Sequence, residues 1–204
     1  MSSARGAADK AALRRAVLSR RAALPPEQRE QVAETCVTAL LPRVQAPVAA
    51  YLSVGTEPGT ARLLAALAQR SVEVLLPVLL PDGDLDWARA DEGVVPGSHG
   101  LLEPAGERLG RDAVSRCATV VVPALAVDRL GHRLGRGGGS YDRALPRTSG
   151  WVVALLHDGE AVTELPAEPH DAPVHALLTP SRGLVRLRPH PADGVGAVPG
   201  GKDE

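Results

Sequence analysis

The chain has 204 residues, 44% hydrophobic and 23% charged, which is ordinary for a single folded α/β domain. Its net charge of −1 gives no polycationic character, which argues against nucleic acid as a partner. No run of about 18 apolar residues is present, and residues 1–10 lack a hydrophobic stretch. We therefore expect no membrane span, no secretion signal and a cytoplasmic location.

The predicted elements begin with two helices. Residues 1–8 are small and polar and predict a disordered tail. A helix is predicted from Asp9 until the prolines at 25–26 interrupt it, and a second helix runs to about Leu41. The apolar stripe of the second helix consists of Val32, Cys36, Val37 and Leu40.

Short apolar runs then alternate with helical patterns. An amphipathic helix is predicted over 60–70, and a turn over 81–84. The strand candidates are 48–52, 72–76, 85–88, 119–122, 152–156 and 174–178. Strands separated by helices predict a three-layer α/β fold, with a mainly parallel sheet covered by helices on both faces. In such folds ligands bind beyond the carboxyl ends of the strands.

Composition sets the domain limits and the character of the core. We expect one domain over 9–186, followed by a disordered tail over 187–204, which is rich in proline, glycine and charge. The core must be mostly aliphatic, because the sequence contains no phenylalanine. Cys36 and Cys117 stand among apolar residues and are predicted to be buried, reduced thiols.

The segment 133–143 reads R-L-G-R-G-G-G-S-Y-D-R and is the strongest candidate for a functional site. Closely spaced glycines allow successive backbone N–H groups to converge on one anion. Arg133 and Arg136 add guanidinium groups that can bind phosphate, and Asp142 offers a carboxylate for a phosphate-bound Mg²⁺. A short helix is expected to begin near Ser140. Composition alone fits a flexible glycine-rich hinge as well.

Known nucleotide motifs do not fit this loop fully. The pattern G-x-x-x-x-G-K-[ST] is absent, because the loop has no lysine, and G-x-G-x-x-G fails at Ser140. Asp158, which follows an apolar run, keeps a dinucleotide-dependent oxidoreductase open as an alternative. His170 and His175 are not at the spacing of a zinc-binding helix, so we assign no metal to histidine.

Beyond the loop, several blocks of sequence resemble the 5-formyltetrahydrofolate cyclo-ligases, also called 5,10-methenyltetrahydrofolate synthetases. The blocks keep the order and spacing of that family across roughly residues 10–180. They are K-A-A-L-R (10–14), Y-L-S-V-G-T-E (51–57), G-L-L-E-P (100–104), the long block V-P-A-L-A-V-D-R-L-G-H-R-L-G-R-G-G-G-S-Y-D-R (122–143) and L-P-A-E-P-H-D-A-P-V (165–174).

The resemblance implies an ATP- and Mg²⁺-dependent ligase. Family members phosphorylate the formyl oxygen of 5-formyltetrahydrofolate, the N10 amine then attacks, and 5,10-methenyltetrahydrofolate, ADP and phosphate are released. Such chemistry requires placement of two anionic substrates and stabilisation of charge, but no protein nucleophile. The implied partners are therefore ATP and the folate, and the family habit implies a monomer.

The resemblance also implies roles for individual residues. The ATP-binding residues would be Lys10, Arg14, Arg133, Leu134, Gly135, Arg136, Gly137, Gly138, Gly139, Ser140 and Tyr141. The folate-binding residues would be Arg14, Leu52, Glu57, Arg136, Gly137, Gly138, Gly139 and Ser140. Arg136 and Tyr141 would be catalytic, and Asp142 and Asp171 would bind Mg²⁺. From the residues alone, Lys10 and Arg14 equally fit a solvated helix face, and Glu57 and Asp171 fit turns.

Two residues depart from the family loop, which commonly reads G-K-G-Y-Y-D. Gly138 stands where that loop has its lysine, and Ser140 where it has its first tyrosine. The changes remove a cation and an aromatic surface, and Arg136 could compensate for the charge. A non-catalytic relative that binds folate or nucleotide is therefore the first alternative to an enzyme.

Overall fold

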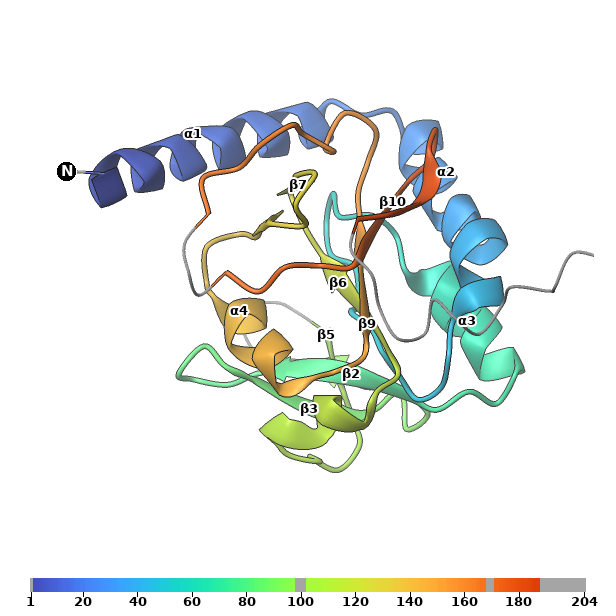
Figure 1. The fold of residues 1–204 in the computed structure, drawn as a ribbon. Helices are drawn as coiled ribbons and strands as arrows, with labels where there is room; N and C mark the ends of the chain where they lie inside the picture. Colours follow the sequence, from blue (N-terminus) through green and yellow to red (C-terminus); the bar gives the residue numbers. More distant parts are fainter. Residues whose placement is uncertain (1, 98–101, 168–170, 188–204) are drawn as a thin grey trace, which may run out of the picture.

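The computed structural model of the protein describes residues 2–97, 102–167 and 171–187 (Figure 1). The α-helices are α1 (Ser2–Ala22), α2 (Pro26–Thr35), α3 (Ala61–Gln69) and α4 (Ser140–Ala144). Shorter helical turns are η1 (Cys36–Leu40), η2 (Leu41–Arg43), η4 (Arg111–Arg116) and η5 (Leu145–Arg147). None of the helices in this part of the chain is long and apolar enough to cross a membrane.

The described residues form one seven-stranded sheet in the order β11-β10-β9-β6-β1-β2-β3. Its strands are β1 (Val48–Ala49), β2 (Val74–Leu79), β3 (Leu85–Arg89), β6 (Thr119–Pro123), β9 (Trp151–Leu155), β10 (Ala176–Thr179) and β11 (Gly183–Arg186). The five inner strands run parallel, and the two edge strands β3 and β11 pair antiparallel to their neighbours. Two-stranded ribbons are formed by β4 (Val94–Pro96) with β5 (Leu102–Pro104), and by β7 (Ala126–Val127) with β8 (Arg133–Leu134).

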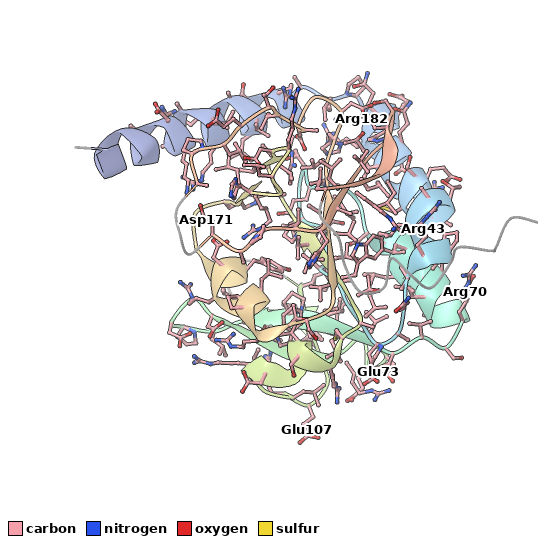
Figure 2. All side chains as sticks on the ribbon, in the orientation of Figure 1. Arg43, Arg70, Glu73, Glu107, Asp171 and Arg182 are labelled. Carbon is pink, nitrogen blue, oxygen red and sulfur yellow. The ribbon has the colours of Figure 1, made fainter. Side chains whose placement is uncertain are left out.

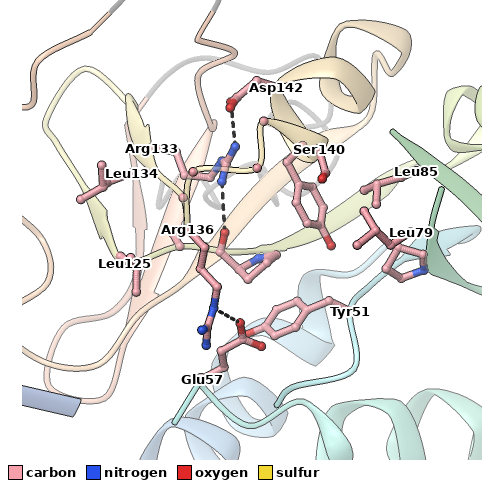
Figure 3. A pocket seen from close by; sticks show the side chains of 18 of the residues that line it. Tyr51, Glu57, Leu79, Leu85, Leu125, Arg133, Leu134, Arg136, Ser140 and Asp142 are labelled. Atoms are coloured by element: carbon pink, nitrogen blue, oxygen red, sulfur yellow. Dashed lines mark hydrogen bonds and ion pairs between the residues drawn. The ribbon is translucent and has the colours of Figure 1, made fainter. Parts of the chain in front are cut away.

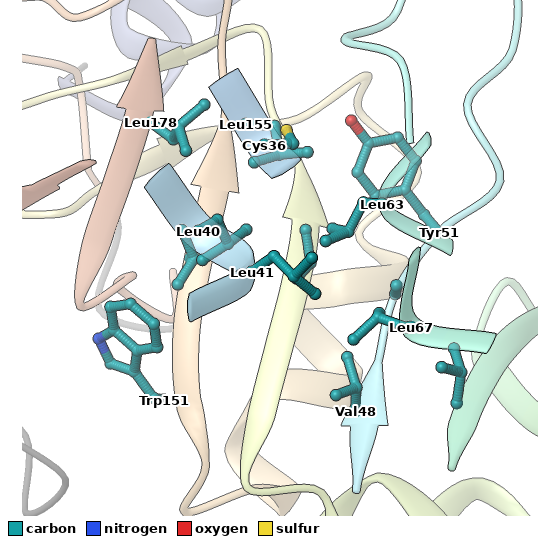
Figure 4. Packing of buried hydrophobic residues seen from close by; sticks show 14 of the residues in the cluster. Cys36, Leu40, Leu41, Val48, Tyr51, Leu63, Leu67, Trp151, Leu155 and Leu178 are labelled. Atoms are coloured by element: carbon teal, nitrogen blue, oxygen red, sulfur yellow. The ribbon is translucent and has the colours of Figure 1, made fainter. Parts of the chain in front are cut away.

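Helices cover both faces of the sheet, because alternate residues of each inner strand point to opposite sides. On one face α2, η1 and α3 contribute Val32, Cys36, Leu40, Leu63 and Leu67 (Figure 4). On the other face η4, α4 and η5 contribute Val114, Ala144 and Leu145. Charged side chains such as Arg70, Glu73 and Glu107 lie at the periphery (Figure 2). The predicted three-layer α/β fold with a mainly parallel sheet is confirmed.

The two cysteines are buried free thiols, as the sequence predicted. Burial raises the pKa of Cys36 to about 12 and that of Cys117 to about 11. Both side chains therefore remain protonated at neutral pH and act as small apolar groups in the core.

Several predicted boundaries were wrong. Helix α1 begins at Ser2, so residues 2–8, which we expected to form a disordered tail, continue the helix that was predicted from Asp9. The last predicted strand begins at Ala176 and is followed by β11, which the sequence did not reveal. The predicted C-terminal tail begins at Leu187, whose N–H donates to the carbonyl of His175 at 2.8 Å. Its remainder, 188–204, lies outside the described residues.

The predicted turn over 81–84 is confirmed as the tip of the β2–β3 hairpin, and a buried carboxylate fixes it to the helical layer. Asp84 is 2% exposed and accepts hydrogen bonds from Arg147 at 3.0 and 2.6 Å and from Arg111 at 3.2 Å. These guanidinium contacts, with the N–H of Leu85, hold the pKa of Asp84 at about 2 against the opposing effect of burial.

We predict that Asp84→Asn lowers the free energy of unfolding by about 2 to 3 kcal/mol at pH 7, because two guanidinium groups lose a charged partner. The pKa of Asp84 is depressed in the folded protein, so its contribution is complete above about pH 4 and is lost as the pH falls toward 2. Urea unfolding at several pH values should show the gap between wild type and variant closing toward low pH. The matched control is Asp112→Asn, because the Asp112 carboxylate is 89% exposed and lies 3.4 Å from Arg147. This substitution should lower the free energy of unfolding by less than about 0.5 kcal/mol.

Candidate active site

A cavity of about 590 Å³ lies at the carboxyl-end edge of the parallel strands. This volume suits a small-molecule ligand. Helix α1 forms one wall, and segments that follow β1 and β6 contribute further lining. The loop after β8, strands β2 and β3 near their hairpin, and β5 provide the rest. All of the residues to which the family resemblance gave a role line this cavity, although they come from segments far apart in the chain.

The glycine loop joins β8 to α4 and has a backbone that side chains would disfavour. Gly137 has φ of +107° and Gly139 has φ of +69°, values that L residues rarely adopt. A Cβ at Gly135 would lie 2.7 Å from Nη1 of Arg133. The backbone therefore favours glycine at Gly137 and Gly139, whereas a side chain at Gly135 would have to displace the end of the Arg133 side chain.

Arg143 fixes the loop to the β2–β3 hairpin. Its Nη2 donates to the carbonyls of Gly138 and Gly83, both at 2.7 Å. The hairpin also brings Leu79 and Leu85 into the cavity. Arg143 thus sets the separation between the glycine loop and this apolar wall.

Three ion pairs dominate the electrostatics of the cavity. Lys10 contacts Asp171 at 2.9 Å, Arg133 contacts Asp142 at 2.7 Å, and Arg136 contacts Glu57 at 3.0 Å.

Figure 3 shows two of these pairs on neighbouring parts of the pocket, and Figure 2 shows Asp171 beneath α1. Each pair joins one cation that the sequence assigned to phosphate with one carboxylate that it assigned to metal or folate. A polyanionic ligand would therefore compete for the cations and release the carboxylates.

Arg14 completes the cationic side of the cavity. Its Nε donates to the carbonyl of Gly135 at 2.9 Å, and its guanidinium lies 3.6 to 3.9 Å from the position of a Cβ on Gly137. Arg14 therefore borders the glycine loop directly. Lys10 and Arg14 are part-buried in these contacts rather than forming the solvated helix face that the sequence left open.

The opposite side of the cavity is apolar. Its lining consists of Tyr51, Leu52, Val54, Pro77, Leu79 and Leu85. In Figure 3, Leu79 and Leu85 lie across the cavity from Leu125 and Leu134. An elongated ligand with a charged end and a flat apolar body would find complementary surfaces at the two sides.

Two tyrosines lie within the cavity and differ in their partners. The Tyr51 hydroxyl donates to the carbonyl of Pro58 at 2.8 Å. The ring of Tyr141 lies 5.6 Å from the Arg133 guanidinium, within range of a cation–π contact. Desolvation raises the pKa of Tyr141, although the charge of Arg133 opposes it, so the phenol stays protonated and can donate a hydrogen bond.

The space around Gly138 is open. A Cβ at this position would meet only Oγ of Ser140, at 3.6 Å, which is an ordinary contact. The residue lines the cavity, so a longer side chain there has room to extend. The glycine is therefore not imposed by the fold.

Metal-binding capacity in the cavity rests on carboxylates. Asp142 and Asp171 both line it, and no cluster of three or more histidine, cysteine or acidic residues suited to a metal occurs among the described residues. Two carboxylates suit Mg²⁺, which usually takes one or two with phosphate and water. Nδ1 of His175 accepts a hydrogen bond from the backbone N–H of Val152 in β9 at 3.0 Å. His170 lies outside the described residues.

The structure disfavours the dinucleotide alternative. Asp158 accepts hydrogen bonds from the N–H and Oγ of Ser181 at 3.1 and 2.7 Å and is not among the described residues that line the cavity. It cannot hold a ribose there. Sequence reasoning also missed lining residues, among them Arg21, whose spacing from Arg14 was an available signal.

Comparison with known proteins agrees with this architecture. The model of the 5-formyltetrahydrofolate cyclo-ligase family matches residues 6–180. The chain is 41% identical over 189 residues to a 5-formyltetrahydrofolate cyclo-ligase of Mycolicibacterium smegmatis, covering 88% of this chain and 97% of that protein. It is 33% identical over 177 residues to the Escherichia coli K12 protein of the same name, covering 81% and 97%.

Solved structures are similar over the same region. The NMR structure of Aquifex aeolicus 5,10-methenyltetrahydrofolate synthetase superposes with a TM-score of 0.73 at 29% identity, covering 88% of this chain and 93% of that one. The Mycoplasma pneumoniae synthetase, at 17% identity and a TM-score of 0.66 over 83% and 97% of the two chains, shares the fold. The length of the family match and the level of identity leave one conclusion: this chain is a member of the 5-formyltetrahydrofolate cyclo-ligase family.

Proposed function

We propose that the protein catalyses the ATP- and Mg²⁺-dependent cyclisation of 5-formyltetrahydrofolate to 5,10-methenyltetrahydrofolate, with release of ADP and phosphate. Family membership supports the reaction. The observation that carries the assignment to this site is the cavity itself, in which the glycine loop and five basic and four acidic residues of the described lining lie beside an apolar wall. We further propose that the protein acts as a monomer in the cytoplasm.

In the proposed reaction, the formyl oxygen attacks the γ-phosphorus of ATP, and ADP leaves. The N10 amine then attacks the activated formyl carbon, and the carbon–oxygen bond breaks to release phosphate. Catalysis of this kind depends on alignment of the two substrates and on stabilisation of phosphoryl charge.

The cationic side of the cavity fits the nucleotide. Lys10, Arg14 and Arg133 would bind phosphate together with backbone N–H groups of the loop over 134–141. Phosphate oxygens would replace Asp171 and Asp142 as partners of Lys10 and Arg133. Binding would thus give Lys10 and Arg133 phosphate oxygens as partners and release the two carboxylates from these ion pairs.

The apolar side fits the folate. Leu52 would contact the pterin, and Glu57 would accept its N–H groups, because Oε1 and Oε2 retain lone pairs beyond those used by Arg136 and the N–H of Val54. Arg14 and the loop 136–140 would complete this subsite at the boundary with ATP. The two substrates would then meet beside Arg136.

Arg136 and Tyr141 are proposed as the catalytic residues. Arg136 is half exposed, and its contact with Glu57 leaves other guanidinium N–H groups able to bind the transferring phosphoryl group. The protonated hydroxyl of Tyr141 can donate to an oxygen that gains charge.

Mg²⁺ would be held by Asp142 and Asp171, whose carboxylates line the same cavity as the proposed phosphate-binding groups. When bound, it would neutralise phosphate charge. Replacement of these two ion pairs by phosphate contacts would let Asp142 and Asp171 turn toward the metal. The metal and the nucleotide are therefore expected to bind best together.

The direct test mixes the protein with ATP, Mg²⁺ and 5-formyltetrahydrofolate and follows methenyl absorbance together with ADP. Stoichiometric formation of both products is expected. Absence of both at high enzyme concentration would sink the ligase assignment. Binding of either substrate without turnover would instead support the non-catalytic alternative suggested by Gly138 and Ser140.

We predict that Asp142→Asn weakens the apparent affinity for Mg²⁺ by about 10- to 100-fold, because an amide is a poorer ligand for Mg²⁺ than a carboxylate. The amide oxygen still accepts a hydrogen bond from Arg133, so the melting temperature should fall by only a few degrees. Steady-state rates over a Mg²⁺ titration measure the first effect. Asp91→Asn is the control, since Asp91 also pairs with an arginine but lies outside the cavity. Full activity of Asp142→Asn across the titration would remove Asp142 from the metal site.

We predict that Gly138→Lys lowers the KM for ATP by about three- to tenfold, because the position is open and an ammonium there would reach the cavity. The gain should shrink as salt is raised. Gly138→Met supplies similar bulk without charge and should give no gain. Equal KM values for wild type and Gly138→Lys would mean that Arg136 already supplies this charge.

A further inference from the structure

A buried ion pair connects the end of α1 to the sheet. Arg21 and Glu160 are 1% and 0% exposed, and their side chains meet through two hydrogen bonds of 2.7 Å. Arg21 also donates to the carbonyl of Ala124 at 2.5 Å, just after β6. Glu160 follows β9. The pair therefore holds the C-terminal turn of α1 against the carboxyl ends of two neighbouring strands.

Arg21 lies on the same face of α1 as the two cations of the cavity. Lys10, Arg14, Val17 and Arg21 follow one another at spacings of four, three and four residues, which form a single helical stripe. At 1.5 Å per residue, Arg14 is about 10 Å and Lys10 about 16 Å along the axis from Arg21. Fixing Arg21 therefore fixes the rotation at which Arg14 and Lys10 face the glycine loop.

The apolar attachment of α1 is small by comparison. Val17 is the fully buried apolar residue that this helix contributes, within a cluster formed with Leu125, Ala126, Leu134 and Leu165, and the partly buried Leu13 and Leu18 pack against the same cluster. Apolar contacts of this kind are non-directional and do not by themselves select one rotation of the helix. A bidentate guanidinium–carboxylate contact permits only one orientation.

A second branch of the same network leads to the folate side. Oε2 of Glu160 accepts the N–H of His157 at 2.9 Å, and Nε2 of His157 lies 3.1 Å from the carbonyl of Thr56. A carbonyl only accepts, so Nε2 carries the proton. Thr56 precedes Glu57, the residue that contacts Arg136.

We propose that Arg21 and Glu160 are positioning residues that set the rotation of α1 and thereby place Arg14 and Lys10 for nucleotide binding. The inference rests on the proposed function, because it assumes that these two cations bind ATP. Glu160 sits at the junction of the network and ties that placement to the loop that carries Glu57. A displacement of about 1 Å at such groups can change their contribution by up to about 100-fold.

The test replaces both partners at once. Arg21→Met combined with Glu160→Met leaves no unpaired buried charge, so the fold should persist. Titration of the full-length protein with ATP and Mg²⁺, without folate, is expected to show binding weakened by about tenfold or more. Arg20→Met is the matched control: Arg20 is exposed, donates to the carbonyl of Gly159 at 3.1 Å and should change affinity less than about twofold.

A double-mutant cycle separates positioning from general loss of structure. In an Arg14→Ala background the charge-pair variant should weaken ATP binding by a clearly smaller factor, because one of the groups that it positions is gone. An unchanged factor in that background would overturn the inference, as would unaltered affinity of the charge-pair variant alone. If Arg14→Ala itself binds ATP as wild type does, the nucleotide assignment fails, and the inference with it.

Circular dichroism and thermal melting accompany each variant. Should the charge-pair variant fail to fold, Glu160→Gln takes its place, since its amide keeps the size and one acceptor but loses the bidentate contact. It should weaken ATP binding in the same direction by a smaller factor, and that effect should again shrink in the Arg14→Ala background. ATP affinity equal to wild type in a folded Glu160→Gln protein would contradict the positioning role.

Discussion

Ion pairs between segments far apart in the chain fix the structure at the edge of the sheet where the cavity lies. Lys10 and Asp171 are 161 positions apart, Arg21 and Glu160 are 139 apart, and Arg136 reaches back 79 positions to the loop after β1. Hydrophobic contacts pack the helices against the sheet, but they do not determine which charged side chains meet at its edge. The ion pairs select one arrangement of α1, the glycine loop and the segment at Asp171, and a defined cavity exists because these three are fixed relative to one another.

The architecture was largely predictable, for a simple physical reason. The inner strands are buried on both faces, so they appear as continuous apolar runs, and the helices between them require crossover connections that make neighbours parallel. The edge strand β3 was predicted, but the edge strand β11 was not, because β11 is half exposed and pairs with β10 across a tight turn. Similarly, the apolar residues by which α1 packs in its cluster are Leu13, Val17 and Leu18, so the small and polar residues 2–8 at its start resembled a tail.

Some residues of the candidate site could be predicted from the sequence, and others could not. The glycine loop and its neighbouring charges could be recognised from composition. The resemblance of several ordered blocks to the cyclo-ligase family added Lys10, Glu57 and Asp171. Leu79 and Leu85 belong to the cavity only because the hairpin folds over it, and leucine in a strand carries no signal of its own. Arg21 was missed for the opposite reason: in a chain rich in arginine, one more on a helix looked ordinary, and its burial depends on Glu160, which lies in a distant segment.

The distribution of aromatic rings has a spectroscopic consequence. Both tryptophans, Trp87 and Trp151, are packed in the core at 1% and 5% exposure and do not line the cavity, whereas Tyr51 and Tyr141 do. Indole emission should therefore report on the integrity of the two hydrophobic layers and respond weakly to ligands. The two tyrosines would instead be in contact with a ligand in the cavity, so indole and phenol side chains report on different parts of the unlabelled protein.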